Sequence, residues 1–364
     1  MGSRGALIVA MSGGVDSSVA AALLREQGWD LLGVTLRLLD AHNVGPDRLS
    51  RAEEAEAQAR TVAEMLGFPH RVLDASAAFE AEVLAPAWRA YAAGRTPSPC
   101  LCCNRKVKFG LLMDEALRLG AAGVATGHYV RRVERDGEPA LLRGVDPDKD
   151  QSYFLFALGP RRLARAFFPL GSMKKTEVRA RAAALGLPCA ARPGSQDACF
   201  AAGQDDGFAE ALRAHFSGEA RAGDIVDPAG RLLGRHDGLH RFTVGQRRGL
   251  GVALGRPAWV SVLDPERATV TVTTREEDLL SAGLLAEEPT WLRRHPEPGE
   301  TWPCEVQIRY RARPVPAAVT VDEDGRLVVR FVAPQRAVTP GQAAVLYRGE
   351  RVLGGGWIEK ALAG

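Results

Sequence analysis

Long hydrophobic runs are missing from this sequence, although 46% of its 364 residues are hydrophobic. No stretch is long enough to cross a bilayer, and the amino terminus lacks the pattern of a signal peptide. We therefore expect a cytoplasmic protein with no membrane partner. A large excess of charge of one sign is also missing, because 47 lysines and arginines nearly balance 44 aspartates and glutamates, and the formal net charge is only +3. This mild excess is compatible with RNA binding but does not by itself indicate it.

Cysteine is scarce as well, with six residues in the chain. Cys100, Cys102 and Cys103 fall within four consecutive positions. In a cytoplasmic protein such clustering favours metal, redox or covalent chemistry over a disulfide framework. Cys102 is expected to be a bystander between the other two. Cys189 and Cys304 lie in apolar surroundings and are expected to be small core residues.

The first two hundred residues alternate between strand and helix patterns. Strands are expected at 6–11, 31–39, 70–73 and 123–126, and helices at 19–24, 51–66, 78–91 and 106–119. Repeated βαβ units imply an α/β domain with a doubly wound parallel sheet, which we place at 1–206. Ligands of such sheets bind beyond the carboxyl ends of the strands.

Helical periodicity fades after about Gly207, where short β-rich runs alternate with glycine, proline and aspartate turns. Strands are expected at 259–263, 268–273, 304–309, 317–321, 327–332 and 343–347. Short antiparallel strands at this spacing suggest a small barrel. The sequence therefore predicts a small β-rich central domain at 207–282 and a carboxy-terminal β-barrel at 283–364.

The first strand and the first helix are joined by a glycine-rich turn, residues 12–18, of sequence SGGVDSS. A strand–turn–helix unit of this kind directs free backbone N–H groups and the positive helix end at an anion. Glycine at two positions lets a phosphate approach the backbone closely. The hydroxyls of Ser17 and Ser18 are further donors, and Asp16 could cap the helix or help to hold Mg²⁺. The plainer alternative is a glycine-rich turn with no ligand.

The turn is not a Walker A loop, because the phosphate-binding lysine of that motif is missing. It resembles the pyrophosphate loop (PP-loop) of the ATP pyrophosphatases, which cleave ATP between its α and β phosphates. Further segments, in order along nearly the whole chain, resemble the tRNA-specific 2-thiouridylase family. These segments are 96–104 (TPSPCLCCN), 125–129 (ATGHY), 148–153 (DKDQSY), 242–251 (FTVGQRRGLG), 309–311 (RYR) and 338–342 (VTPGQ).

The resemblance implies ATP-dependent 2-thiolation of the wobble uridine, position 34, of tRNA. AMP is transferred from ATP to O2 of the uridine with release of pyrophosphate. A sulfur nucleophile then attacks C2, and AMP leaves. A carbonyl oxygen is a poor leaving group until it is adenylylated, and an ionised persulfide or hydrosulfide is a strong nucleophile. The implied partners are tRNA and a sulfur donor such as a persulfide carrier, a cysteine desulfurase or sulfide, and the implied cofactors are ATP and Mg²⁺.

By position in this resemblance, Cys103 is the nucleophile and Cys199 bears the persulfide sulfur, and the two end as a disulfide that must be reduced. One form of the family has Asp where Cys100 stands and Asn where Ser98 stands. Cys100, Cys103 and Cys199 would instead provide three thiolates, enough to hold a [4Fe–4S] cluster with one iron open to sulfide. Cysteine persulfide and cluster-bound sulfide both stay open. A structural zinc site is the plain alternative.

The resemblance also assigns nucleotide and RNA contacts. The nucleotide pocket is expected to be lined by Ala10, Met11, Ser12, Gly13, Gly14, Val15, Asp16, Ser17, Leu36 and Gly127. RNA contacts are expected at Ser98, Pro99, Cys100, His128, Lys149, Asp150, Gln151, Arg309, Tyr310 and Gln342, and the central domain is expected to bind RNA. Arginine suits phosphates and tyrosine suits unpaired bases. Taken singly, most of these residues would be ordinary strand or solvated turn residues.

Two other functions stay open. A PP-loop adenylylating ligase or synthetase acting on a small metabolite would account for the glycine-rich turn but not for the three cysteines. A non-enzymatic RNA-binding or redox module would account for the barrel but would make an intact phosphate-binding turn superfluous.

Overall fold

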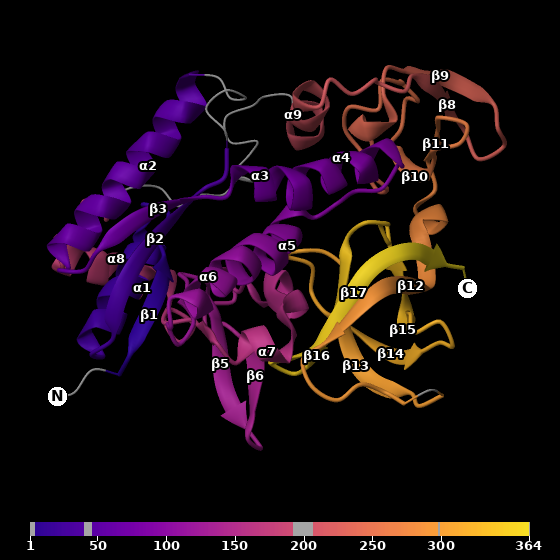
Figure 1. Ribbon diagram of the computed structural model, residues 1–364. Helices are drawn as coiled ribbons and strands as arrows, with labels where there is room; N and C mark the ends of the chain where they lie inside the picture. The colour runs from indigo at the N-terminus through magenta and orange to yellow at the C-terminus, as the bar shows by residue number, and fades with distance from the viewer. Residues whose placement is uncertain (1–3, 40–45, 192–206, 298, 364) are drawn as a thin grey trace.

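The computed structural model describes residues 4–39, 46–191, 207–297 and 299–363 (Figure 1). A parallel sheet with its helices lies on the left of the figure, a barrel at the lower right, and a small β-rich domain at the upper right. Helix α5 lies between the sheet and the barrel. The expected succession of an α/β domain, a central β-rich domain and a β-barrel is confirmed.

The amino-terminal sheet has five parallel strands in the order β3-β2-β1-β4-β7. Its strands are β1 (Ala6–Ala10), β2 (Asp30–Arg37), β3 (His70–Asp74), β4 (Val124–Ala125) and β7 (Ala166–Phe167). Helices α1 (Val15–Glu26), α2 (Pro46–Met65) and α8 (Lys175–Ala184) cover the face that carries Leu7 and Val9. The other face, with Ile8, packs against the helical run that bears the cysteines. Both faces are covered, which explains why β1 is apolar throughout.

The remaining helical segments of this domain are short. They are α3 (Ser76–Phe79), η2 (Glu80–Leu84), α4 (Ala85–Ala92), α5 (Pro99–Cys102), η3 (Cys103–Leu111), α6 (Leu112–Arg118), η4 (Ser152–Leu158) and α7 (Gly159–Leu163). The helix expected at 78–91 is therefore a run of three segments. The helix expected at 106–119 begins earlier, at Pro99, because proline fits the first turn of a helix.

A hairpin of β5 (Val130–Arg135) and β6 (Glu138–Arg143) was not expected from the sequence. Its turn residues, Asp136 and Gly137, both have positive φ, of 54° and 76°. An Asp-Gly pair is a strong hairpin signal, so the sequence did contain the information.

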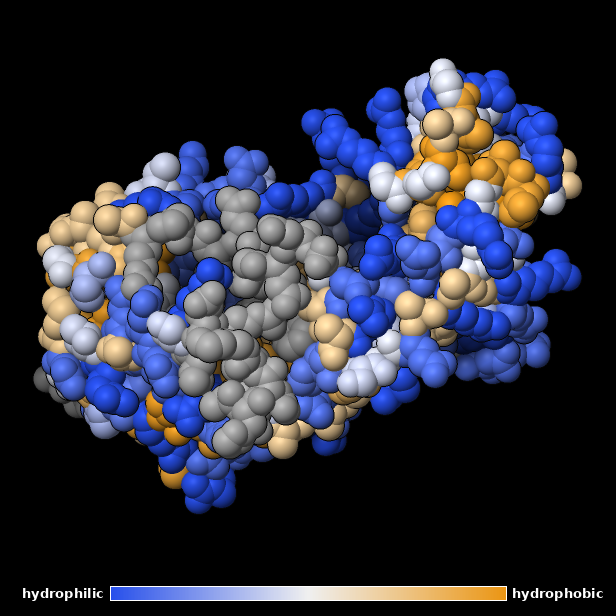
Figure 2. Space-filling view, turned by 90° about the horizontal axis from the view of Figure 1, so that it is seen from above, coloured by the Kyte–Doolittle hydropathy of each residue, from blue (hydrophilic) through white to orange (hydrophobic). Residues whose placement is uncertain are grey.

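The central domain holds a four-stranded sheet in the order β10-β11-β8-β9. Its elements are α9 (Gly207–His215), β8 (Gly223–Val226), β9 (Leu232–His236), η5 (Leu239–Arg241), β10 (Trp259–Asp264), β11 (Thr269–Thr273) and η6 (Glu276–Leu279). Ile225, Val260 and Val270 form the centre of its core. The surface seen in Figure 2 is mostly hydrophilic, with apolar side chains gathered at one end.

The carboxy-terminal strands form a closed barrel. They are β12 (Leu280–Trp291), β13 (Trp302–Gln307), β14 (Val315–Val321), β15 (Leu327–Arg336), β16 (Ala343–Arg348) and β17 (Arg351–Leu362). They follow the order β12-β15-β14-β13-β16-β17, and pairing of β12 with β17 closes the ring. Strand β17 also pairs with β6 of the hairpin through Arg351 and Leu142, so the barrel is joined to the first domain.

In the part of the chain that the structure describes, no helix combines the length and apolar character needed to traverse a membrane.

Candidate active site

The turn after β1 is organised by serine hydroxyls. Ser17 Oγ donates to the carbonyl of Gly14 at 3.1 Å, and Ser18 Oγ donates to the same carbonyl at 2.9 Å. Ser17 Oγ also accepts a hydrogen bond from the backbone N–H of Ser12 at 3.2 Å. These bonds hold the loop in one conformation without a ligand. Binding of a ligand therefore costs little conformational entropy of the loop.

This loop leaves the amino-terminal end of α1 uncapped. The N-cap residue is Gly14, and no side chain makes a capping bond there. The first amides of a helix have no acceptor within the helix, and together with the helix dipole they favour an anion at this end. Gly13 has a φ of +71°, and a Cβ on it would lie 2.4 Å from the carbonyl oxygen of Ala55. Only glycine fits this position.

The loop after β4 closes against the same helix end. A Cβ on Gly127 would lie 2.8 Å from the carbonyl carbon of Asp16 and 2.9 Å from the backbone nitrogen of Ser17. In the sheet, β1 lies between β2 and β4, so the chain leaves β1 toward one side and later returns on the other. This is the switch point where doubly wound sheets bind their ligands.

Asp16 is held by two side chains whose roles the sequence did not indicate. Its Oδ1 accepts a hydrogen bond from the Tyr129 hydroxyl at 2.7 Å and from the Lys175 ammonium at 2.5 Å. Burial, together with the neighbouring Asp16 carboxylate, raises the pKa of Tyr129, so its hydroxyl stays protonated and donates. A lysine therefore stands beside the loop, although the loop's own sequence has none. Its place in α8 could be found only from the tertiary structure.

The cysteine cluster begins a continuous helical run formed by α5, η3 and α6. The turns from Cys103 to Leu111 have π-helical geometry, which is frequent at functional sites. Cys100 is exposed, whereas Cys103 is buried beside Phe79 and Val83. Residues three apart lie on neighbouring turns of a helix, so the two thiols belong to one side of the run.

Of the other cysteines that the structure describes, Cys189 is a buried core residue as expected, whereas Cys304 is only partly buried. Cys102 is partly buried, and burial raises the pKa of its thiol. Cys189 is buried in the core of the first domain, and burial raises the pKa of Cys304 in the barrel to about 12. Cys199 lies outside the described residues. Within those residues no group of three or more Cys, His, Asp and Glu side chains could hold a metal ion.

Two contacts connect the carboxyl edge of the sheet with the cysteine run. Leu36, near the end of β2, packs against the hydrophobic cluster that contains Cys103. The ring of His128, which follows Gly127, lies 6.1 Å from the ring of Phe109 in η3. The glycine-rich loop and the cysteines thus border the same edge of the sheet.

The backbone before the cysteines is held by both of the other domains, the central domain and the barrel. The Thr96 hydroxyl donates to the hydroxyl of Thr243 in the central domain at 3.0 Å. From the barrel, the Pro340 carbonyl accepts the Thr96 N–H, and the Gln342 side-chain amide donates to the Thr96 carbonyl, both at 2.9 Å. We refer to these bonds as the Thr96 clasp.

Comparisons with known proteins agree along the chain. Residues 5–203 match the tRNA methyl transferase HUP domain, residues 212–274 the tRNA methyl transferase PRC-barrel domain, and residues 281–358 the aminomethyltransferase beta-barrel domain. The tRNA-specific 2-thiouridylase MnmA of Chloroflexus aurantiacus is 47% identical over 97% of this chain and 98% of its own length. The proteins of the same name from Geobacter metallireducens and Acidithiobacillus ferrooxidans are 45% and 46% identical, over 99% and 97% of this chain and 98% and 97% of their own lengths.

The chain belongs to the tRNA-specific 2-thiouridylase family.

Two of the residues that the 2-thiouridylase family implies as RNA contacts, Arg309 and Gln342, form hydrogen bonds within the protein. Arg309 donates to the carbonyls of Val244 and Ala337 and to the hydroxyl of Thr339, at 3.0, 2.7 and 2.5 Å. Burial lowers its pKa. Gln342 belongs to the Thr96 clasp. In this state of the molecule both side chains hold the barrel against neighbouring segments.

Tyr310 and His128 are packed against other rings. The Tyr310 ring lies 4.3 Å from that of Phe154. His128 is buried, with Nδ1 2.8 Å from the hydroxyl of Thr126. Burial lowers the pKa of His128 well below its ordinary value, so the ring is neutral at pH 7.

In the 149–151 turn of this 2-thiouridylase family member, two of the three side chains are bound within the protein. Asp150 accepts bonds from Arg143 and Ser152, both at 2.8 Å, and Gln151 Oε1 accepts the N–H of Tyr129 at 3.0 Å. No described residue pairs with the ammonium of Lys149. Lys149 is therefore the member of this turn that is most available to an RNA phosphate.

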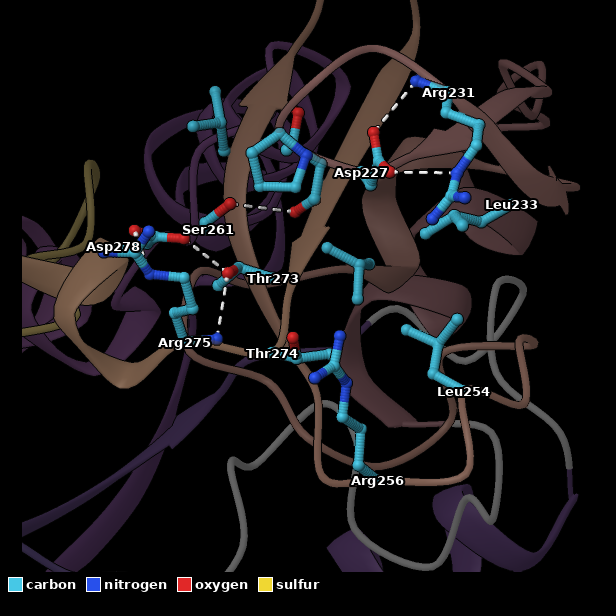
Figure 3. Close-up of a pocket in the computed structure, with 14 residues that line it drawn as sticks. Asp227, Arg231, Leu233, Leu254, Arg256, Ser261, Thr273, Thr274, Arg275 and Asp278 are labelled. Carbon is cyan, nitrogen blue, oxygen red and sulfur yellow. Dashed lines mark hydrogen bonds and ion pairs between the residues drawn. The ribbon is translucent and has the colours of Figure 1, made fainter.

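A pocket of about 660 Å³ lies in the central domain (Figure 3). Arg231, Arg256 and Arg275 line it together with serine and threonine hydroxyls. Asp227 pairs with Arg231 at 3.1 Å, and Asp278 lies 3.7 Å from Arg275. Arg256 has no carboxylate partner in the described structure. The pocket is not part of the loop and cysteine site.

Proposed function

We propose that this protein is a tRNA-uridine 2-sulfurtransferase that uses ATP to replace O2 of the wobble uridine with sulfur. One observation carries the proposal: the uncapped end of α1 and the helical run bearing Cys100 and Cys103 border the same edge of the parallel sheet. The name and full-length similarity of the relatives support thiolation over a ligase reaction on a small metabolite. A purely RNA-binding module would have no use for a phosphate-binding helix end beside a pair of cysteines.

In the first step the loop would hold the phosphates of ATP. The open amides at the start of α1 and the hydroxyl of Ser17 are donors of the kind that bind phosphate oxygens. Asp16 fits Mg²⁺, because this ion is usually held by one or two carboxylates together with substrate phosphates. O2 of the uridine attacks the α phosphorus, the bond to the β phosphate breaks, and pyrophosphate leaves. Leu36 and Gly127 would border the nucleotide.

In the second step sulfur would be delivered from the cysteine side. Cys103 attacks Sγ of a Cys199 persulfide, a disulfide forms between the two residues, and hydrosulfide is released. Hydrosulfide attacks C2 of the adenylylated uridine, and AMP leaves with the oxygen. An external thiol must then reduce the disulfide. The sulfur donor that loads Cys199 would be a persulfide carrier or a cysteine desulfurase, whereas sulfide, which is already fully reduced, would serve only the cluster described next.

The alternative sulfur source is a [4Fe–4S] cluster on Cys100, Cys103 and Cys199, which would supply sulfide bound to an open iron. Cys100 and Cys103 fit this set in chemistry and in spacing along the helical run. Iron and acid-labile sulfide in anaerobically reconstituted protein distinguish the two sources. Full turnover of iron-free protein with a persulfide donor would exclude the cluster.

RNA would be held by the Ser98–Cys100 segment, by Lys149 and by the barrel residues around Arg309. An anticodon base must be turned outward to reach a site at the edge of a sheet. The division of the chain at 1–206, 207–282 and 283–364 belongs to this proposal, with RNA contacts in all three parts. Arg256 and the neighbouring hydroxyls of the central pocket are suitable donors for phosphate oxygens.

The test is a reaction of purified protein with ATP, a persulfide donor and tRNA that lacks thiolation, followed by digestion and nucleoside analysis. 2-Thiouridine at the wobble position is expected. An ATP analogue with a methylene group between the α and β phosphates is the control and should give none. Pyrophosphate release that depends on a small acid or amine instead of tRNA would favour the ligase.

A further inference from the structure

Lys175 enters the phosphate loop from a distant part of the chain. Its ammonium lies 2.5 Å from Oδ1 of Asp16, 159 positions earlier in the sequence. The lysine belongs to the first turn of α8, and its backbone N–H donates to Asp146 at 2.8 Å. The helix that carries it packs on α1, the helix whose open end faces the loop. Lys175 is therefore a cation placed beside the predicted phosphate position.

The ion pair alone does not explain why a lysine is buried here. The Lys175 side chain is 14% exposed, whereas that of Asp16 is 35% exposed. Asp16 already receives a hydrogen bond from Tyr129 at 2.7 Å, so its carboxylate would be satisfied by that donor and water. Burying an ammonium costs free energy that a partly exposed pair recovers only in small part. A second anion in the site would make use of this charge.

We propose that Lys175 binds the β and γ phosphates of ATP, and then the pyrophosphate that leaves, in the role that the loop lysine has in Walker A proteins. This inference rests on the proposed function and deepens it. The lysine side chain is a flexible stem with a compact charge, so its ammonium can move from Asp16 to a phosphate oxygen by rotation. Asp16 is then free to face Mg²⁺.

The assigned role is electrostatic. When the bond between the α phosphorus and the bridging oxygen breaks, the electron pair stays on the pyrophosphate. Negative charge therefore grows beside the ammonium, and stabilising that charge lowers the barrier. No proton needs to leave Lys175, and AMP, which lacks the β and γ phosphates, would not contact it.

The experiment measures binding of ATP, pyrophosphate and AMP to the full chain by calorimetry. Removing Lys175 alone is ambiguous, because an unpaired Asp16 carboxylate would itself repel phosphate. The decisive comparison is therefore between D16N and the double variant D16N/K175M, in which the carboxylate is absent from both. K175R, which keeps the charge, and K174M, which removes the neighbouring exposed lysine, are the matched controls. Thermal unfolding of each variant verifies that it is folded.

We expect pyrophosphate and ATP to bind D16N/K175M about tenfold or more weakly than D16N, the effect of losing one hydrogen bond to a charged group. AMP should bind the two equally, K174M should resemble the unaltered protein, and K175R should keep part of the affinity. Equal pyrophosphate affinity of D16N and D16N/K175M would overturn the role of Lys175. If the unaltered protein bound neither ATP nor pyrophosphate, the proposed function itself would fail, which is a different result.

Discussion

The side-chain amide of Gln342 donates a hydrogen bond to the backbone carbonyl of Thr96 at 2.9 Å, although 246 positions separate the two residues. Thr96 lies just before the cysteine run, so a barrel residue fixes the backbone that leads to Cys100. RNA that bound the Gln342 amide would compete for this bond. RNA that docked on the barrel would thereby loosen the Thr96 clasp and the backbone that leads to Cys100.

Replacing Gln342 with Ala is expected to loosen this connection. The clasp loses one hydrogen bond, worth about 1 kcal/mol of unfolding free energy, and exchange of the backbone amides of Thr96 and Ser98 should become faster. Gln335→Ala is the matched control, because Gln335 is partly exposed and its side-chain amide donates to the carbonyl of Ala333, two positions away in the same strand. Unchanged exchange in the Gln342 variant would show that the clasp does not hold the segment.

Cys103→Ser is expected to lower the thiolation rate by about three orders of magnitude or more, because a hydroxyl cannot replace the sulfur nucleophile. ATP binding should be unaffected, since the glycine-rich loop is intact. Thiouridine formation and nucleotide affinity are measured on the same sample. Cys304→Ala, in the barrel, should retain full activity. A Cys103→Ser protein with normal turnover would remove this residue from the chemistry.

Lys149→Ala is expected to weaken tRNA binding and to reduce the slope of log affinity against log salt by about one, as for the loss of a single phosphate contact. Binding is measured as a salt titration. Arg25→Ala is the control. It also removes one positive charge, but Arg25 lies in the last turn of α1, at the end away from the glycine-rich turn, and the slope should stay unchanged. If Lys149→Ala gave the slope of the unaltered protein, this turn would not touch the RNA backbone.

Stability at acid pH should depend on Glu210, which connects α9 to η5 within the central domain. Its carboxylate lies 2.9 Å from Nε2 of His240 and also contacts Arg213 and Arg241. Burial raises the pKa of Glu210, but these three donors outweigh burial and lower it from 4.5 to about 2. A carboxyl whose pKa is lower in the folded state stabilises it above the unfolded pKa. This contribution is lost as the pH falls from about 4.5 toward about 2.

The check is urea unfolding of the unaltered protein and of Glu210→Gln at two pH values, about 5.5 and about 3.5. The difference in unfolding free energy between them should shrink at the lower pH. Glu64→Gln, an exposed residue of α2, should show no such change. A difference independent of pH would mean that the Glu210 charge does not stabilise the fold.

The sequence was sufficient to predict those elements whose local residue pattern alone determines their structure. The apolar strand, glycine turn and helix at residues 6–26 follow from local chemistry, and the structure has them there. Strand β17 was not predicted, and consecutive glycines such as Gly354, Gly355 and Gly356 are unfavourable inside a strand. These glycines are needed because added Cβ atoms would meet carbonyl oxygens of neighbouring strands at 2.3, 2.5 and 2.8 Å. Such crowding has no local signature.

The site was predicted in part. The loop and the cysteine run could be located because each is a contiguous segment with its own chemistry. Lys175 could not be located, because its role depends on how α8 packs against α1. The internal bonds of Arg309 and Gln342 were equally invisible, since their acceptors are mostly backbone carbonyls of segments distant in the sequence, which no sequence pattern marks.

Closure of the barrel through β12 and β17 has a consequence for synthesis of the chain. The ring stays open until residues 351–362 have been made, because β17 supplies both the last seam and the link to the β5–β6 hairpin. Every strand of the parallel sheet lies before residue 168, so that sheet can assemble on the ribosome much earlier. A translation fault near the 3′ end of the message would therefore leave a folded nucleotide-binding lobe attached to an unclosed, aggregation-prone tail.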